Sequence, residues 1–112
     1  MNSLNSILIE GVIQDDSVLQ TTPRGLEVCS FTIAVSRAYK QYDIEENEIS
    51  YFDVDTWGKL GEECKIKCLK GLAVRVAGRM KQERWTDDNG RHQSKLKVIA
   101  EHVDFKPMSI PS

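Results

Sequence analysis

The stretch that decides the fold is Ser50-Tyr51-Phe52-Asp53-Val54-Asp55-Thr56-Trp57-Gly58-Lys59-Leu60-Gly61. Successive side chains of a β-strand point to opposite faces. Residues 50–57 therefore predict a strand in which Phe52, Val54 and Thr56 face the core. Its other face carries two large aromatic rings and two carboxylates: Tyr51, Asp53, Asp55 and Trp57. A half-buried strand normally turns its large rings inward and leaves a plainly polar outer face.

The outward rings of this strand have two interpretations. Rings on a rigid sheet suit a partner with flat π-faces, and nucleic-acid bases are the commonest such partner. Alternatively, Tyr51 and Trp57 pack against a neighbouring element or a second subunit, as large apolar groups often do. The strand by itself leaves both interpretations open.

The composition is that of one globular domain. The chain has 112 residues, of which 40% are hydrophobic and 29% charged, and this length is sufficient to bury a core. The net charge of −2 does not indicate a nucleic-acid binder. However, residues 43–55 contain six acidic and no basic residues, whereas Lys and Arg predominate from Lys65 to Lys97. Such segregation is compatible with a basic groove in an acidic protein.

The sequence lacks the signals of a membrane or secreted protein. It has no apolar run of the ~18 residues that a membrane span needs, and no signal peptide. Three cysteines without a disulfide framework fit a reducing compartment. We therefore expect a cytoplasmic, nucleoid-associated location and no membrane partner.

Catalytic and metal-binding patterns are also missing. Cys64 and Cys68 are spaced i, i+4, but no CxxC pattern or further paired ligand accompanies them or the two histidines, His92 and His102. The two cysteines are predicted to be small core residues, and no cofactor is expected. No Ser/His/Asp order, phosphate-cradling glycine loop or convergent carboxylate pair indicates an enzyme.

The hydrophobic pattern predicts five strands and one helix. The strands are expected over residues 4–14, 26–39, 50–57, 72–85 and 92–105. Leu60 to Lys70 have near-helical spacing, and Gly71 is a typical stop signal. Residues 40–49 are polar and predict a protruding, mobile loop that connects a hairpin. Asn89-Gly90 is a strong hairpin turn signal.

The order of these elements is that of an OB-fold. It predicts an all-β, five-stranded barrel with one short helix between strands 3 and 4. The domain is expected to span residues 1–105, followed by a flexible tail over residues 106–112.

The pattern also predicts which side chains are buried. In the last strand, Leu96, Val98 and Ala100 are expected to point inward, with a slip in parity before Val103. In the first strand, three isoleucines are expected to point outward and to leave apolar surface for another subunit: Ile7, Ile9 and Ile13.

Over about residues 4–105 the chain resembles the bacterial-type single-stranded DNA-binding protein family. The motifs that carry the resemblance are Ile7-Leu8-Ile9-Glu10-Gly11, Phe31-Thr32-Ile33-Ala34-Val35-Ser36, Tyr51-Phe52-Asp53-Val54, Trp57-Gly58-Lys59-Leu60, Lys70-Gly71, Val74-Arg75-Val76-Ala77-Gly78, Arg84-Trp85-Thr86-Asp87 and Asn89-Gly90. Each motif is weak alone, but their order and spacing together are specific.

The resemblance implies a homotetramer of OB-folds that binds and protects single-stranded DNA, without sequence preference, during replication, recombination and repair. The stacking residues that it implies are Tyr39, where the family often has Trp, Trp57, where it often has Phe, and Tyr51 and Trp85. The phosphate contacts that it implies are Arg37, Lys59, Arg75, Arg79, Lys81, Arg84, Lys95 and Lys97. For Trp85 the alternative is that its ring covers the open end of the barrel.

Two features depart from the family pattern. Members usually end in a linker and an acidic tip that recruits repair and replication enzymes, and this sequence has no acidic residue after Asp104. Either it is truncated or it lacks that docking signal, so such recruitment is in doubt. In addition, Asp53 and Asp55 would repel phosphate on the predicted binding face; we expect them to pair with Arg75 and Arg79 across neighbouring strands.

Two other functions are compatible with the same pattern. In one, the fold is a protein–protein adaptor or replication-restart factor whose rings line an interface. In the other, the ligand is RNA, since RNA binding uses the same stacking and phosphate contacts.

Overall fold

The computed structural model describes residues 2–105 of the chain, so the predicted tail over residues 106–112 lies outside the described residues. The elements are β1 (Ile7–Ile13), β2 (Val18–Thr21), β3 (Glu27–Gln41), β4 (Ile44–Trp57), α1 (Gly58–Lys67), β5 (Ala73–Thr86) and β6 (His92–Phe105). The strand order in the sheet is β1-β5-β6-β4-β3-β2. An additional pairing of β1 with β3 closes five of these strands into a barrel, with β2 on the outer edge of β3.

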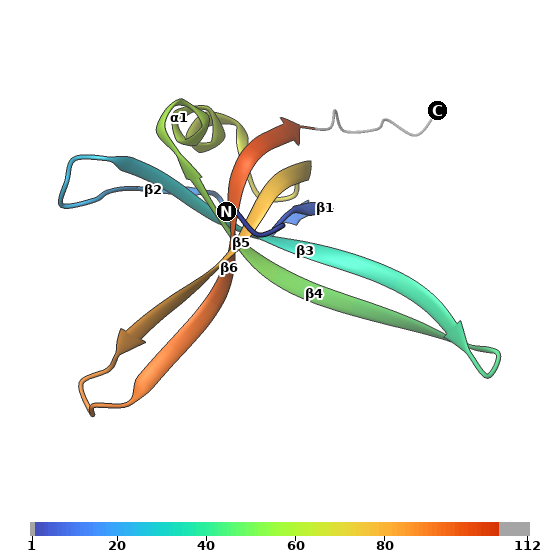
Figure 1. Ribbon diagram of the computed structural model, residues 1–112. Coiled ribbons are helices and arrows are strands. Elements are labelled where there is room, and N and C mark those ends of the chain that lie inside the picture. The colour runs from blue at the N-terminus through green and yellow to red at the C-terminus, as the bar shows by residue number, and fades with distance from the viewer. Residues whose placement is uncertain (1, 106–112) are drawn as a thin grey trace.

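The barrel confirms the predicted OB-fold. As predicted, the helix lies between the third and fourth strands of the barrel. These strands are labelled β4 and β5, because the short strand β2, which was not predicted from the sequence, is counted in the numbering. All strand pairs are antiparallel except β4 with β6, which are parallel. Two long hairpins, β3–β4 and β5–β6, extend from the barrel in different directions and form two arms (Figure 1).

The core follows the alternation of the sequence. Cys29, Phe31 and Ile33 on β3 are buried, as are Val54 and Thr56 on β4. The buried residues of β1, β5 and β6 are Ile13, Val74, Val76, Val98, Ile99, Ala100 and Val103. Burying an aliphatic side chain of this size contributes about 1.5–3 kcal/mol, so the interior holds the barrel together.

The helix α1 covers one end of this core. Cys64 on α1 and Cys68 just after it are fully buried and free of disulfides, as the sequence predicts for small core residues. The helix ends at Lys67, earlier than expected. Gly71 lies in the turn that follows, where its φ of +90° needs a residue without a side chain.

Gly11 allows the barrel to close. A Cβ on this residue would collide with the backbone carbonyl of Ala34 on β3, so only glycine lets β1 approach β3 this closely. A β-bulge interrupts the pairing of β5 with β6. Ala77 pairs with His102 and Gly78 with Ala100, so Glu101 has no partner residue on β5. The bulge explains the slip in parity that the sequence shows before Val103.

The expectation of a loop over residues 40–49 is wrong. β3 and β4 remain paired as far as Gln41 and Ile44. Only Tyr42 and Asp43 form the turn, with φ of +52° and +63°. A two-residue turn with positive φ at both positions matches the right-handed twist of the strands. The polar side chains of this segment are exposed because the arm extends beyond the core, and its backbone still forms a ladder.

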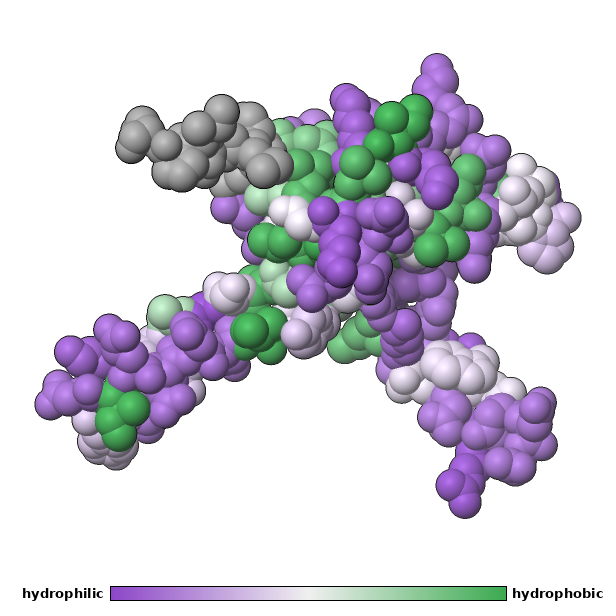
Figure 2. Space-filling view, turned by 180° about the vertical axis from the view of Figure 1, so that it is seen from behind, coloured by the Kyte–Doolittle hydropathy of each residue, from purple (hydrophilic) through white to green (hydrophobic). Residues whose placement is uncertain are grey.

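Two expectations about burial are also wrong. Ile13 is buried, and Ile7 and Ile9 are half-buried against the core, so the exposed apolar residues of β1 are Leu8 and Val12. Leu96 is 62% exposed because it lies on the β5–β6 arm, beyond the barrel. Seen from behind, apolar surface gathers on the barrel, whereas the arms are mainly hydrophilic (Figure 2).

Candidate nucleic-acid interface

The outer face of β4 carries the two aromatic rings that the sequence places there. Tyr51 is 63% exposed and Trp57 is 38% exposed. In the β3–β4 ladder they lie opposite Ala34 and Val28. Residues opposite each other in a ladder share a face, so small or short side chains of β3 border both rings. β4 therefore presents aromatic surface to solvent, while Val54 and Thr56 on its other face are buried in the core.

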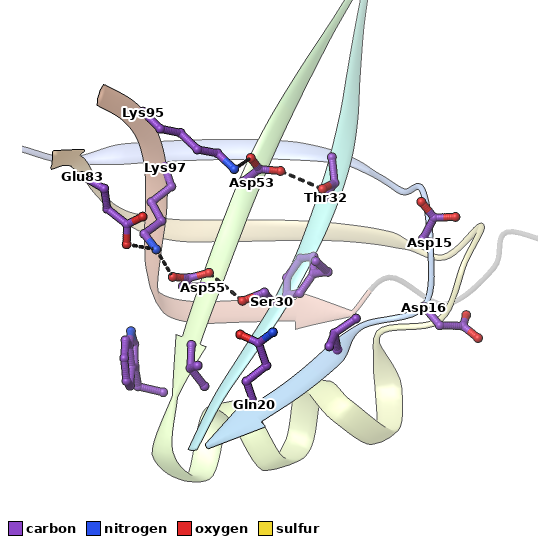
Figure 3. A pocket seen from close by; sticks show the side chains of 14 residues that line it. Asp15, Asp16, Gln20, Ser30, Thr32, Asp53, Asp55, Glu83, Lys95 and Lys97 are labelled. Atoms are coloured by element: carbon purple, nitrogen blue, oxygen red, sulfur yellow. Dashed lines mark hydrogen bonds and ion pairs between the residues drawn. The ribbon is translucent and has the colours of Figure 1, made fainter. Parts of the chain in front are cut away.

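A groove of about 600 Å³ lies on this face of the barrel. Trp57 forms part of its wall, and Tyr51 lies further along the same face of β4. Side chains from β2, β3, β4, β5 and β6 and from the segment before β2 surround it (Figure 3). The polar lining consists of Asp15, Asp16, Gln20, Ser30, Thr32, Asp53, Asp55, Glu83, Lys95 and Lys97.

Ion pairs join the two sides of this groove. Lys95 Nζ on β6 lies 2.5 Å from Asp53 Oδ2 on β4, and the Thr32 hydroxyl donates a 2.8 Å hydrogen bond to Asp53 Oδ1. These contacts occupy both oxygens of the Asp53 carboxylate (Figure 3).

Lys97 makes a second, more buried arrangement. Its ammonium lies between Asp55, at 2.5 Å, and Glu83, while the Ser30 hydroxyl donates to Asp55 at 2.8 Å. The side chains of Lys97 and Asp55 are 14% and 9% exposed.

The expected pairing of Asp53 and Asp55 with Arg75 and Arg79 is wrong. β6 lies between β4 and β5 in the sheet, so the lysines of β6 reach these carboxylates first. Arg75 instead forms an ion pair with Glu10 of β1, at 3.0 Å.

These contacts shift two titration equilibria. The hydrogen bond from Lys95 lowers the pKa of Asp53, against the opposing effect of burial. Burial alone would lower the pKa of Lys97, but its hydrogen bonds to Asp55 and Glu83 outweigh that effect and leave the pKa raised. Both shifts favour the charged forms, so the groove holds its ion pairs at neutral pH.

The other two predicted stacking residues lie on the arms. Trp85, 48% exposed, faces Gln93 near the tip of the β5–β6 arm. It has the same parity on β5 as Glu83, so it lies on the groove side of that arm. Tyr39, 43% exposed, faces Glu46 on the β3–β4 arm. Its parity is opposite to that of Ala34, so Tyr39 lies on the other face of the ribbon from Tyr51.

The predicted basic residues fall into two groups. Lys95, Lys97 and Arg75 are engaged by carboxylates, and Arg84 donates two hydrogen bonds to the Gln82 side chain. Within residues 2–105, no ion pair is formed by the remaining four: Arg37, Lys59, Arg79 and Lys81.

These four cations lie on different parts of the molecule. Lys81 lies opposite Lys97 on the groove side of β5, and Arg79 shares that parity. Lys59 is exposed on the first turn of α1. Arg37 lies opposite Glu48 on the same ribbon face as Tyr39.

Sequence reasoning missed several groove residues. Ser30 and Thr32 are the hydroxyl partners of the two aspartates, and Glu83 is the second partner of Lys97. The alternation of the sequence places each of them on an outer face, but their meeting depends on the register between strands, which the sequence pattern does not give.

The described part of the chain contains no group of three His, Cys, Asp or Glu residues arranged to hold a metal ion. None of its helices has the length and apolar character needed to cross a membrane.

Comparison with known proteins identifies the family. The family model described as the single-strand binding protein family matches residues 4–106. A single-stranded DNA-binding protein of Aquifex aeolicus is 39% identical over 101 residues, which are 89% of this chain and 68% of that protein. One from Treponema pallidum is 32% identical over 105 residues, 94% of this chain and 59% of that protein. The chain thus spans about three-fifths to two-thirds of the length of these relatives.

Solved structures share the fold. A Plasmodium falciparum SSB in complex with ssDNA superposes with a TM-score of 0.87 at 16% identity, covering 96% of this chain and 98% of that one. A deletion mutant of the single-stranded DNA binding protein from Thermus aquaticus gives 0.83 at 24% identity, covering 94% and 51%. At these identities the likeness concerns the fold, and the family rests on the sequence matches. The chain belongs to the single-strand binding protein family.

Proposed function

We propose that this protein binds and protects single-stranded DNA without sequence preference, in replication, recombination and repair at the nucleoid. It acts as a binding protein and not as an enzyme. Bases stack on Tyr51, Trp57 and Trp85, with Tyr39 as a further ring on the β3–β4 arm. The observation that carries the proposal is the exposure of Tyr51 and Trp57 on the rigid outer face of β4.

The chemistry of this face suits single strands. Every base has a π-face, so stacking tolerates any sequence. Unpaired bases are accessible in a single strand, whereas a duplex buries its bases in the stack. The phosphates are contacted by exposed cations, of which Arg79 and Lys81 lie on the groove side of β5 without an ion pair in the described part of the chain. Lys59, Arg84 and Arg37 are further candidates.

We also propose that the chain self-associates, as the homotetramer that the family resemblance implies. Leu8 and Val12 are 69% and 42% exposed on the outer face of β1. Leu8 and Val12 lie on either side of the exposed Glu10 on that face, and a subunit interface there would remove both apolar side chains from water.

The test is a competition experiment. A labelled thymidine oligonucleotide is bound to the protein, and unlabelled single-stranded DNA, single-stranded RNA and duplex DNA of equal length compete for it. The proposal predicts that single-stranded DNA competes best. Preferential competition by RNA would support the RNA alternative, and failure of the labelled DNA to bind would leave the adaptor role.

Single substitutions test the stacking residues. In single-strand-binding proteins, removal of a stacking ring costs about 1–3 kcal/mol, or about 5- to 150-fold in Kd. We expect Tyr51→Ala and Trp57→Ala to show losses in this range. Tyr42→Ala is the matched control, because this ring is 89% exposed at the tip of the β3–β4 arm, away from the groove.

A further inference from the structure

The groove beside Trp57 has an unexpected charge for a surface that binds a polyanion. Five acidic side chains line it against two lysines. Asp53, Asp55 and Glu83 all contact these lysines directly. The lysines of β6 are therefore neutralised within the protein, and the lining as a whole is acidic.

The two lysines differ in how firmly they are held. Lys97 is 14% exposed and contacts two carboxylates, so its release would leave charged groups poorly solvated, which is costly. Lys95 is 51% exposed, and its partner Asp53 is 39% exposed. An exposed pair of this kind contributes little to stability. Lys95 is thus the lysine whose pairing can be changed without damage to the fold.

We propose that the carboxylates of Asp53, Asp55 and Glu83 set the path of the bound strand by excluding its phosphates from the groove floor. The inference rests on the proposed function. Phosphate oxygens are repelled by the carboxylates, and the lysines that would attract them are already engaged. The bases face the aromatic wall at Trp57, and the backbone follows cations outside the floor, of which Arg79 and Lys81 are the nearest in register.

The dependence of affinity on salt reports how many phosphates are contacted. For single strands, log K falls with log salt with a slope of about −0.7 for each contact. A cation that is already paired with a carboxylate adds little to this slope, because it has few counterions to displace. Removing the carboxylate frees the cation and adds one contact. Over a fourfold increase in salt, one contact corresponds to a further loss of about 2.6-fold in affinity.

Asp53→Asn is the decisive variant. An asparagine still accepts the hydrogen bond of the Thr32 hydroxyl but no longer neutralises Lys95. Binding of a thymidine oligonucleotide is measured between 50 and 200 mM NaCl. We expect Asp53→Asn to bind more tightly at low salt, with a slope steeper by about 0.7. The control is Glu62→Gln, which removes the same charge from an exposed position on α1, outside the groove.

Lys95→Ala, alone and combined with Asp53→Asn, completes a double-mutant cycle. In the wild-type background we expect it to leave the slope unchanged, whereas in the Asp53→Asn background it should abolish the added contact. Two results would overturn the inference while leaving DNA binding intact. One is an equal gain in affinity in Asp53→Asn and in Glu62→Gln. The other is a shallower salt slope for Lys95→Ala in the wild-type background. Absence of binding by the wild-type protein would overturn the inference and the proposed function together.

Discussion

Removal of Lys97 tests how the groove is held together. Lys97→Met keeps most of the length and apolar stem of the side chain but removes the ammonium between Asp55 and Glu83. Asp55 then becomes a nearly buried carboxylate without its cation, beside a second carboxylate. Breaking a buried ion pair from one side costs about 3–5 kcal/mol.

The expected cost here is smaller than that of a fully buried pair. The Glu83 side chain is 41% exposed and can turn toward water, and Asp55 keeps the hydrogen bond from Ser30. We therefore expect Lys97→Met to lower the free energy of unfolding by about 2–4 kcal/mol. With an m-value of about 1.5 kcal/mol/M, the urea midpoint should fall by about 1.3–2.7 M.

A second substitution separates the charge effect from loss of packing. Asn at position 55 still accepts from Ser30 but carries no charge, so the double variant Asp55→Asn, Lys97→Met should lie within about 1 kcal/mol of the wild type. Lys95→Met is the exposed control, with an expected cost below about 1 kcal/mol. Unfolding is followed in urea at one fixed protein concentration, because self-association would otherwise shift the midpoint. A cost below about 0.5 kcal/mol for Lys97→Met, or a double variant no more stable than the single one, would refute this reasoning.

Three further predictions follow from the fold and its charges. Gly11→Ala should destabilise the protein by about 1–3 kcal/mol in urea unfolding, because its Cβ collides with the Ala34 carbonyl where the barrel closes; a wild-type unfolding curve would contradict this. The pKa of Asp53 is lowered in the folded state, so its contribution to stability should be present above about pH 4 and disappear as the pH falls through the folded-state pKa. Wild type should accordingly be more stable than Asp53→Asn at pH 7 by no more than about 1 kcal/mol, and the two should converge near pH 2; a difference that stays constant with pH would count against the ion pair. Finally, Ellman's reagent should leave all cysteines of the native protein unmodified and react with every one after unfolding in guanidinium, since each is fully buried: Cys29, Cys64 and Cys68.

The sequence predicts the barrel because its signals are local. Alternation in Phe31 to Val35 and in Phe52 to Thr56 depends only on which face a residue takes, and Asn89-Gly90 marks a turn through its own backbone preferences. These features are confirmed. The pairing of β3 and β4 as far as Gln41 and Ile44 was not predictable in this way, because the polar side chains of this exposed arm show no apolar alternation.

The errors at the site have a different origin. The carboxylates of Asp53 and Asp55 could be placed on the outer face of β4 from the sequence. Their partners could not, because β6 pairs with β4 although residues 58–91, including β5, separate the two strands. Which cation is nearest depends on this parallel pairing and its register, and Lys95 and Lys97 therefore replace the expected arginines. Similarly, Leu96 has the parity of the core but lies beyond its end.

The most direct test of the central claim, that exposed indole rings stack on unpaired bases, uses tryptophan fluorescence. The chain has two tryptophans, so Trp85→Phe reports on Trp57 alone and Trp57→Phe reports on Trp85 alone. Each protein is titrated with a thymidine oligonucleotide, and binding is confirmed independently by anisotropy of a labelled strand. Stacking predicts that the emission of Trp57, and also that of Trp85, is strongly quenched at saturation. Unchanged emission from Trp57 while the labelled strand is fully bound would contradict the account.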